Sequence, residues 1–367
     1  MHLRTSKTYG FMKNVKLGGS LLMAAALFSS CVEQTDVEMH TNINSDGTCT
    51  RIVSYSDVMS QEMRDTLWTD TSRRHAEPIP ECLQIDGYSY SSTTVGKGDT
   101  VTTTLIHNYE NVEEMSSDVP VVLNGQQLQA SSTFEKRFRW FYTDYTFTEV
   151  FCSIADKFLL PLADYVDDDV ASFWFTGQPG MLEGLSGAEI TEQITPMESA
   201  VTNWLNDNIF QLNFNYIVNH YDSVSNPPIT REQFVAQHDS FRDFVMKSGD
   251  ILAADHKKLL KDFFHSDAYG FFFDGTPSSQ ALEKENVKLL NVFNLSVPYT
   301  ITMPGHITDA GTGLCQNDTV FYSLTGERLI PHDYIITASS RVNHVWAYIV
   351  TVLVVVLASV FVLYRRS

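Results

Sequence analysis

Apolar and polar side chains alternate along residues 37–43, and a second extended run covers residues 49–55. Alternation with a period of two puts one set of side chains on each face of a strand, and the Asp46-Gly47 pair between the runs is typical of a hairpin turn. The pattern continues with two more extended runs and two short helices, at 85–92, 100–107, 58–68 and 111–115. It predicts a β-rich segment over residues 31–151.

Residues 134–151 are unusually aromatic, and the apolar face of this run changes near Phe141. The change predicts either a bulge in one long strand or a strand that is covered on different faces at its two ends. Large aromatic side chains most often belong to the core, so core packing is the favoured interpretation. Stacking against sugars or bases is the alternative.

Between residues 152 and 287 the apolar residues recur at helical spacing, which predicts a helical insert. Pro227-Pro228 interrupts the insert, and Thr230 with Gln233 forms a capping box for a helix that Gly249 ends. A further helix is predicted from Asp250 to Phe264.

The pattern becomes extended again from Lys288, so residues 288–344 are predicted to be β-rich. A β-rich beginning and a β-rich end on either side of a helical insert indicate an α+β fold. We expect one mixed or antiparallel sheet that is built from the N-terminal and C-terminal segments together.

Residues 345–364 form a run of 20 residues without a charge, followed by Arg365, Arg366 and Ser367. At 1.5 Å per residue such a helix spans the roughly 30 Å hydrocarbon layer of a bilayer. Its aromatic ends and the arginine pair favour a transmembrane helix over a buried core helix. The positive-inside rule then places the tail 365–367 in the cytoplasm.

The other end of the chain, residues 1–30, has four basic residues, no acidic one, and a short apolar run before Ser29-Ser30-Cys31. This order is typical of a secretory signal peptide, and the cysteine after small residues resembles a bacterial lipoprotein signal. We therefore predict cleavage before Cys31 and lipidation of its thiol. An ordinary cleaved signal is the alternative, and either Met1 or Met12 is the start.

The chain has 44 acidic and 25 basic residues, a formal net charge of −19. The acidity argues against a nucleic-acid partner, because no basic face is available for phosphates. Without the signal and the C-terminal arginines, residues 31–344 hold 19 basic and 44 acidic residues, a net charge of −25. Such a surface could attract cationic partners or divalent ions, although a solvated surface is the favoured interpretation.

Four further cysteines would lie in an oxidising compartment, and Cys49 with Cys82 is the first candidate for a disulfide. Buried free thiols are the alternative. No zincin, P-loop, dinucleotide-binding or nucleophile-elbow motif occurs. His238 and His256, with Asp255, are candidates for a zinc site if their helices face each other, but core histidines are the favoured interpretation. We expect no cofactor.

Several short stretches together resemble uncharacterised membrane lipoproteins of the Bacteroidetes type and, more distantly, the LppM-like lipoproteins. These stretches are Asn44–Gly47, Tyr109–Met115, Phe138–Thr143, Thr302–Gly305, Asp333-Tyr334 and Ala338–Asn343. The resemblance covers the two ends and the strand near Trp140, and it implies a lipid cysteine, a β-rich body and a C-terminal membrane helix. It brings no catalytic residues.

The leading hypothesis is a lipoprotein of the bacterial inner membrane without evident catalysis. Its body would face the periplasm and its C-terminus the cytoplasm, and an acidic domain would bind or assemble with envelope proteins. One alternative is an envelope hydrolase that acts on glycan or lipid through a carboxylate pair. Another is a lipid-handling protein with an apolar cavity inside the sheet. A deep pocket with convergent buried acids would favour the hydrolase.

Overall fold

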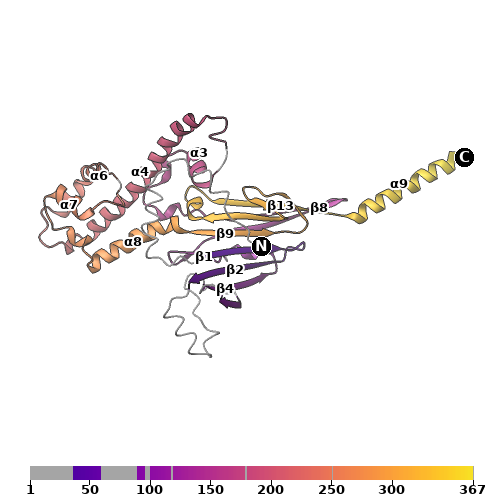
Figure 1. The fold of residues 1–367 in the computed structure, drawn as a ribbon, viewed down its shortest axis with the longest axis horizontal. Helices are drawn as coiled ribbons and strands as arrows, with labels where there is room; N and C mark the ends of the chain where they lie inside the picture. Colours follow the sequence, from indigo (N-terminus) through magenta and orange to yellow (C-terminus); the bar gives the residue numbers. More distant parts are fainter. Residues whose placement is uncertain are drawn as a thin grey trace, which may run out of the picture. The chain divides into compact units, whose positions relative to one another are not determined.

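The computed structural model describes residues 36–58, 89–95, 100–116, 119–177, 180–249 and 251–366 (Figure 1). The predicted signal peptide, Cys31, most of the helix predicted at 58–68, and Cys82 lie outside these residues. The chain divides into two compact units. We call Ile154–Asn294 the helical unit, and Gln34–Ser153 with Leu295–Ser367 the sheet unit.

A seven-stranded sheet forms one layer of the sheet unit. Its strand order is β11-β12-β9-β1-β2-β4-β3, and β1 pairs with β9 in parallel while the other neighbours are antiparallel. The strands are β1 Asp36–Ile43, β2 Cys49–Val58, β3 Ser89–Val95, β4 Thr100–Tyr109, β9 Ser296–Thr302, β11 Leu314–Gln316 and β12 Thr319–Thr325. The predicted β1–β2 hairpin is confirmed.

A second, four-stranded antiparallel sheet has the order β10-β13-β8-β7. Its strands are β7 Ala130–Phe138, β8 Tyr142–Phe151, β10 His306–Asp309 and β13 Tyr334–Asn343, and β5 Val122–Leu123 with β6 Gln126–Gln127 forms a small separate ladder. The α+β class is confirmed. It is also confirmed that strands of the N-terminal and C-terminal segments pair in one sheet. The expectation of a single sheet is wrong, because β7, β8, β10 and β13 pair with one another instead of extending the first sheet.

The aromatic run 134–151 is a hairpin and not one long strand. The chain reverses between β7 and β8, and the Arg139 amide donates to the Tyr142 carbonyl over 2.8 Å. The change of apolar face near Phe141 is therefore the reversal itself. Beyond it, side chains of β8 alternate between buried and half-buried along its full length.

The helix α9, Val345–Arg366, follows β13 after a single residue, His344 (Figure 1). By length and composition it could cross a membrane. Most of its side chains are exposed, and Ala347 is its buried residue. This is the arrangement expected of a span whose outer surface is apolar.

The helical unit contains α3 Asp168–Ala171, α4 Gly187–Asn219, α5 Arg231–Ala236, α6 His238–Met246, α7 His256–Phe264 and α8 Pro277–Asn294. The helical unit also has short helical turns at Ala155–Lys157, Leu162–Asp164, Ser172–Thr176, Tyr221–Ser223 and Gly270–Phe273, and the sheet unit has such turns at Val112–Met115 and Gly326–Leu329. The capping box of Thr230 and Gln233 is present at the start of α5. Asp167 caps α3 by accepting from the Val170 amide, so the Asp167–Asp169 run begins a helix.

Three helix boundaries differ from the prediction. The helix after Thr230 breaks at Gln237 into α5 and α6, where neither glycine nor proline marks the break. The next helix begins at His256, because the Asp255 carboxylate accepts from the Lys258 amide at 3.0 Å and caps it. The segment from Lys288 stays helical to Asn294, since Leu289, Leu290 and Val292 are buried on α8.

Aromatic packing forms the core of the helical unit. The Phe234 ring is fully buried and lies 5.0 Å from the Phe214 ring and 4.9 Å from the Phe264 ring. The Tyr269 ring lies 5.1 Å from Phe234, and its hydroxyl is 2.9 Å from the Tyr221 hydroxyl. One ring from α5 thus joins α4 and α7, so the unit needs no regular sheet to close its core.

Two glycines with nearly the same φ angle test the packing of the β9–β10 turn. Gly305 has φ +80° and Gly125 has φ +77°, but a Cβ at Gly305 would collide with the Arg341 carbonyl, whereas at Gly125 it meets no described atom within 4 Å. We expect Gly125→Ala to cost about 1 kcal/mol of unfolding free energy from backbone strain, and Gly305→Ala about 3 kcal/mol. Urea denaturation of the full chain in detergent measures both. Equal losses would contradict the close approach of the turn to β13.

Candidate functional site

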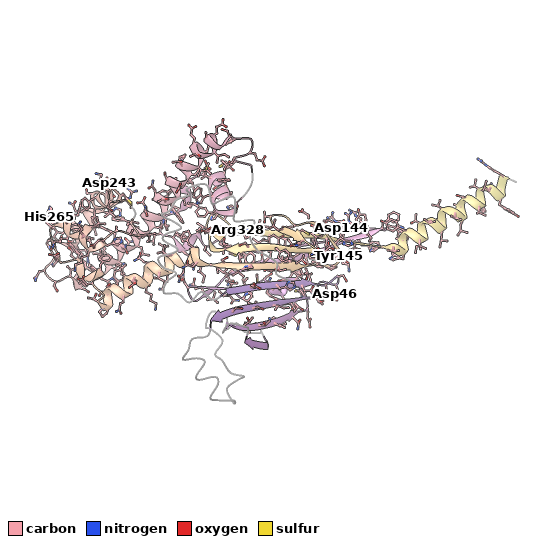
Figure 2. The ribbon with its side chains drawn as sticks, viewed as in Figure 1. Asp46, Asp144, Tyr145, Asp243, His265 and Arg328 are labelled. Carbon is pink, nitrogen blue, oxygen red and sulfur yellow. The ribbon has the colours of Figure 1, made fainter. Side chains whose placement is uncertain are left out.

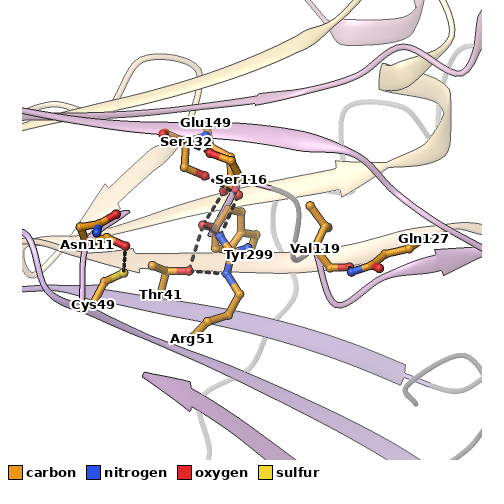
Figure 3. Close-up of polar contacts among 10 residues, drawn as sticks. All are labelled: Thr41, Cys49, Arg51, Asn111, Ser116, Val119, Gln127, Ser132, Glu149 and Tyr299. Carbon is orange, nitrogen blue, oxygen red and sulfur yellow. Dashed lines mark hydrogen bonds and ion pairs between the residues drawn. The ribbon is translucent and has the colours of Figure 1, made fainter. Parts of the chain in front are cut away.

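A buried polar cluster joins the two sheets of the sheet unit (Figure 3). It consists of Thr41 on β1, Arg51 on β2, Ser132 on β7, Glu149 on β8 and Tyr299 on β9, and we call it the Arg51–Glu149 cluster. Each of these residues is at most 1% exposed. Charges are found at such depth when they are paired and hydrogen-bonded.

The alternation of side chains along each strand explains why these residues point inward. Arg51 lies between the buried residues Cys49 and Val53, and Glu149 lies between Phe147 and Phe151. Because successive side chains point to opposite faces, every second residue of each strand faces the other sheet. The signal in the sequence was a charged residue at a position of the strand where the alternation calls for an apolar one, and neither Arg51 nor Glu149 was among the predicted site residues.

The carboxylate of Glu149 has a partner at each oxygen. Arg51 Nη2 lies 2.8 Å from Oε1, and the Ser132 hydroxyl donates to the same oxygen over 3.2 Å. The Tyr299 hydroxyl donates to Oε2 over 2.7 Å. The ion pair is therefore held by further hydrogen bonds, as a buried pair requires to offset its desolvation.

Tyr299 and Thr41 extend the cluster on the side of the larger sheet. Arg51 donates from Nη2 to the Tyr299 hydroxyl at 3.1 Å and from Nε to the Thr41 hydroxyl at 3.2 Å. The two hydroxyls are 2.9 Å apart. Because the Tyr299 proton is given to Glu149, Thr41 is the donor to Tyr299. Burial, and then the neighbouring Glu149 charge, raise the pKa of Tyr299 well above its usual value.

This geometry supports a structural role. Its five side chains have almost no access to solvent, so an external substrate could not reach the carboxylate. The contacts connect β1, β2 and β9 of one sheet with β7 and β8 of the other. We conclude that the Arg51–Glu149 cluster fixes how the two sheets face each other.

A second buried acid, Asp207 on α4, has an equivalent arrangement in the helical unit. Arg242 on α6 donates from Nε to its Oδ1 over 2.7 Å, and the Tyr165 hydroxyl donates to its Oδ2, also over 2.7 Å. Burial and the bond to Asp207 raise the pKa of Tyr165 to about 12. Glu149 in the sheet unit and Asp207 in the helical unit are thus each held in an ion pair with an arginine.

A groove of about 380 Å³ crosses β1, β2, β9 and β12. Its lining is mixed in polarity and consists of Glu38, Met39, His40, Ile52, Ser54, Pro298, Thr300 and Phe321. Glu38 is the acidic residue among them, so the groove lining lacks the second carboxylate of a glycosidase site. In the helical unit, an apolar cavity of about 20 Å³ beside Phe210 and Leu260 has room for about one water molecule, far less than an acyl chain needs.

The three residues considered for zinc have other partners. His238 lies 2.8 Å from Asp239 Oδ1 and 3.0 Å from Gln211 Oε1. The His256 ring stacks on Phe273 at 5.3 Å, and burial lowers the pKa of His256. Asp255 caps α7. Within the described parts of the chain, His, Cys, Asp and Glu side chains form no group of three that could hold a metal ion.

Among the cysteines that the structure describes, Cys49, Cys152 and Cys315 are free. The Cys49 thiol is buried and lies 4.0 Å from the Asn111 carbonyl, and burial raises its pKa to about 12. Cys82, its predicted partner, and Cys31, the predicted lipid attachment site, are outside the described residues. Both assignments stay predictions.

The end of the sheet unit from which α9 continues is rich in aromatic contacts, and Figure 2 marks Asp144 and Tyr145 near it. The His344 amide donates to the Phe141 carbonyl over 2.7 Å, and its Nε2 lies 2.9 Å from the Thr143 hydroxyl. The His344 ring stacks on Phe138 at 5.1 Å. The β7–β8 hairpin therefore holds the residue that links β13 to α9.

Comparisons with known proteins give little guidance. No family model matches the chain, and no curated protein matches it. Among solved structures, the folded domain of the LppM protein of Mycobacterium tuberculosis is similar at 8% identity, over 86% of this chain and 94% of that chain, with a TM-score of 0.24. That likeness is a distant one at most, and it provides no link to the Bacteroidetes lipoproteins.

Removal of one charge from the Arg51–Glu149 cluster leaves the other buried without compensation. We expect Arg51→Met or Glu149→Gln to lower the unfolding free energy by about 3–5 kcal/mol, and the double variant Arg51→Met/Glu149→Met to lose less than either. Denaturation of the full chain in detergent measures the losses. The control is Arg341→Met, which breaks a partly exposed pair with Asp144. Single losses no larger than the control would contradict the role of the cluster.

The raised pKa of Tyr299 predicts a loss of stability at alkaline pH. Above pH about 10 the unfolded chain releases the tyrosine proton while the folded chain keeps it, so the unfolding free energy falls as pH rises. A fully buried tyrosine contributes up to about 1.4 kcal/mol per pH unit there. Tyr269 and Tyr322 also have raised pKa values and add to the slope. Tyr299→Phe should reduce the slope by about one proton in urea denaturation at several pH values. An unchanged slope would show that Tyr299 ionises as readily in the folded chain.

Proposed function

We propose that this chain is a membrane-tethered lipoprotein of the bacterial cell envelope. A lipid on Cys31 and the helix α9 are its two tethers to the inner membrane. Between them an acidic α+β domain is held on the periplasmic side, where it binds or assembles with other envelope components. The arginines after residue 364 lie in the cytoplasm.

The observation that carries this proposal is the direct connection between β13 and α9. His344 is the single residue between them, and it bonds to Phe141 and Thr143 of the neighbouring hairpin. A flexible linker would let the domain move away from the bilayer. Here the strand, the hairpin and the helix are joined by hydrogen bonds and ring contacts, so the sheet unit stays at the membrane surface.

Binding is favoured over catalysis by the state of the buried acids. The carboxylates of Glu149 and Asp207 are each engaged by an arginine and a tyrosine. A general acid or base needs access to a substrate proton, which these groups lack. The groove across β1, β2, β9 and β12 has a lining of mixed polarity in which Glu38 is the acidic residue, so this lining offers no carboxylate pair for hydrolysis.

Both tethers are testable in a bacterial host. Radiolabelled palmitate should enter the wild type and the control variant Cys315→Ala, whose cysteine is exposed, but not Cys31→Ala. Alkaline phosphatase should be active when fused after Asn343, before α9, and inactive when fused after Ser367.

Two outcomes would overturn the proposal separately. Incorporation of palmitate into Cys31→Ala would show that Cys31 is not the lipid attachment site. Active phosphatase after Ser367 would reverse the orientation, because that enzyme folds in the periplasm, where disulfides form.

A further inference from the structure

The tip of the β7–β8 hairpin, residues 136–142, has a composition unlike the rest of the chain. It contains three basic residues and four aromatic ones, Lys136, Arg137, Phe138, Arg139, Trp140, Phe141 and Tyr142, and no acid. The whole chain carries a net charge of −19. Basic and aromatic side chains together are typical of surfaces at the lipid–water interface.

This tip packs along the first two turns of α9. Trp140 donates from its indole Nε1 to the Thr351 hydroxyl over 2.9 Å, and its ring meets the Trp346 ring edge-on at 5.2 Å. The Phe141 ring lies 4.8 Å from the Tyr348 ring. Ala347 between these contacts is fully buried, so the tip is in close contact with the helix.

The charges at the far end of α9 fix how deep the tip would lie. Arg365 and Arg366 follow 20 uncharged residues, whose helix is about 30 Å long, the thickness of the hydrocarbon layer. Val345 then lies near the opposite boundary of that layer, and Thr351 lies about 9 Å further along the helix. Because Trp140 bonds to Thr351, the tip cannot remain in bulk water while α9 spans the bilayer.

The side chains of the tip suit that position. Phe138 is 60% exposed and Trp140 is 48% exposed, which is unfavourable in water and favourable in an interfacial layer. The Trp140 indole proton already has an acceptor within the protein, so its transfer out of water leaves no donor unsatisfied. The Trp140 side chain can therefore enter the interfacial layer without the usual penalty for an unsatisfied polar group.

Two of the basic groups are available for lipid headgroups. Lys136 donates to the Ser45 carbonyl, and Arg341 of the adjacent strand pairs with Asp144 and stacks on Tyr142. Arg137 and Arg139 are exposed, and neither forms an ion pair with a residue in the described parts of the chain. Their long side chains can extend from a buried tip to the phosphate level.

We propose that residues 136–142 are a lipid-binding site. Phe138 and Trp140 insert into the interfacial layer of the leaflet that α9 enters, and Arg137 and Arg139 bind the phosphate groups of anionic phospholipids. The site rests on the proposed function in one respect, the insertion of α9, and is independent of lipidation at Cys31. It gives an otherwise acidic body a basic contact with anionic headgroups and fixes the orientation of the sheet unit on the membrane.

Tryptophan quenching tests the insertion. The full chain is reconstituted into nanodiscs of phosphatidylcholine and phosphatidylglycerol, with or without brominated acyl chains, as wild type, Trp140→Phe and Trp346→Phe. Trp346 reports α9 itself. Brominated chains quench a tryptophan that contacts lipid. If Trp140 and Trp346 are the described tryptophans in contact with lipid, the loss of emission caused by bromine should be about half as large in each single variant as in the wild type.

The two tryptophans separate the possible failures. If Trp346→Phe lowers the quenched emission and Trp140→Phe does not, α9 inserts but the tip stays outside, and the lipid-binding site is wrong while the proposed function stands. If wild-type emission is not quenched at all, α9 does not insert, and both proposals are wrong.

Charge variants test the headgroup contact. Quenching of Trp140 should increase when phosphatidylglycerol replaces part of the phosphatidylcholine, and this dependence should disappear in Arg137→Gln/Arg139→Gln. The matched control, Lys247→Gln/Lys258→Gln, removes two exposed charges from the helical unit and should retain the dependence. An undiminished phosphatidylglycerol effect in the arginine variant would overturn the assignment of these two residues to anionic lipid.

Discussion

The ion pair between Arg51 and Glu149 is the constraint on which the sheet unit depends. A buried charge is tolerated when its partner is present, so β2 of one sheet must meet β8 of the other at this position. Three hydroxyls from further strands hydrogen-bond to the pair: Thr41 accepts from Arg51, and Ser132 and Tyr299 donate to Glu149. A shift of one residue in any of these strands would turn a cluster side chain to the opposite face. The pair therefore specifies the register of these strands as well as the contact between the two sheets.

The same strand that carries Glu149 leads to the end of the sheet unit from which α9 continues. Toward its start, β8 reaches Asp144, which pairs with Arg341 of β13, and then the hairpin that contacts α9. The distance along β8 from Glu149 to Tyr142 is about 23 Å at the usual strand rise. Because β8 is fixed at one end by the buried cluster and pairs with β13 and β7 along its length, the hairpin tip and the start of α9 have a defined position in the sheet unit.

Several elements were predictable because a local pattern determines them. The β1–β2 hairpin follows from alternation around Asp46-Gly47, the start of α5 from the capping box at Thr230, and α9 from its uncharged run. Others depend on distant partners. The reversal at Arg139–Phe141 has no glycine or proline to mark it, and β13 contains polar residues such as Ser339 and Ser340 that become strand only by pairing with β8 and β10. The apolar pattern of residues 288–294 fits a helix as well as a strand. These residues continue α8 because Leu289, Leu290 and Val292 are buried on that helix.

The sequence by itself determined the α+β class, the helix that could cross a membrane and the uneven distribution of charge, because composition and short-range periodicity suffice for these. The tertiary structure decided which strands form two sheets, which charged residues lie at their interface, and that the aromatic hairpin contacts α9. Arg51 and Glu149 are 98 positions apart, and Trp140 and Thr351 are 211 apart. Such contacts form when long-range pairing sets the strand register. The energy of a buried charge or of a hydrogen-bonded indole depends on the partner that the fold places next to it.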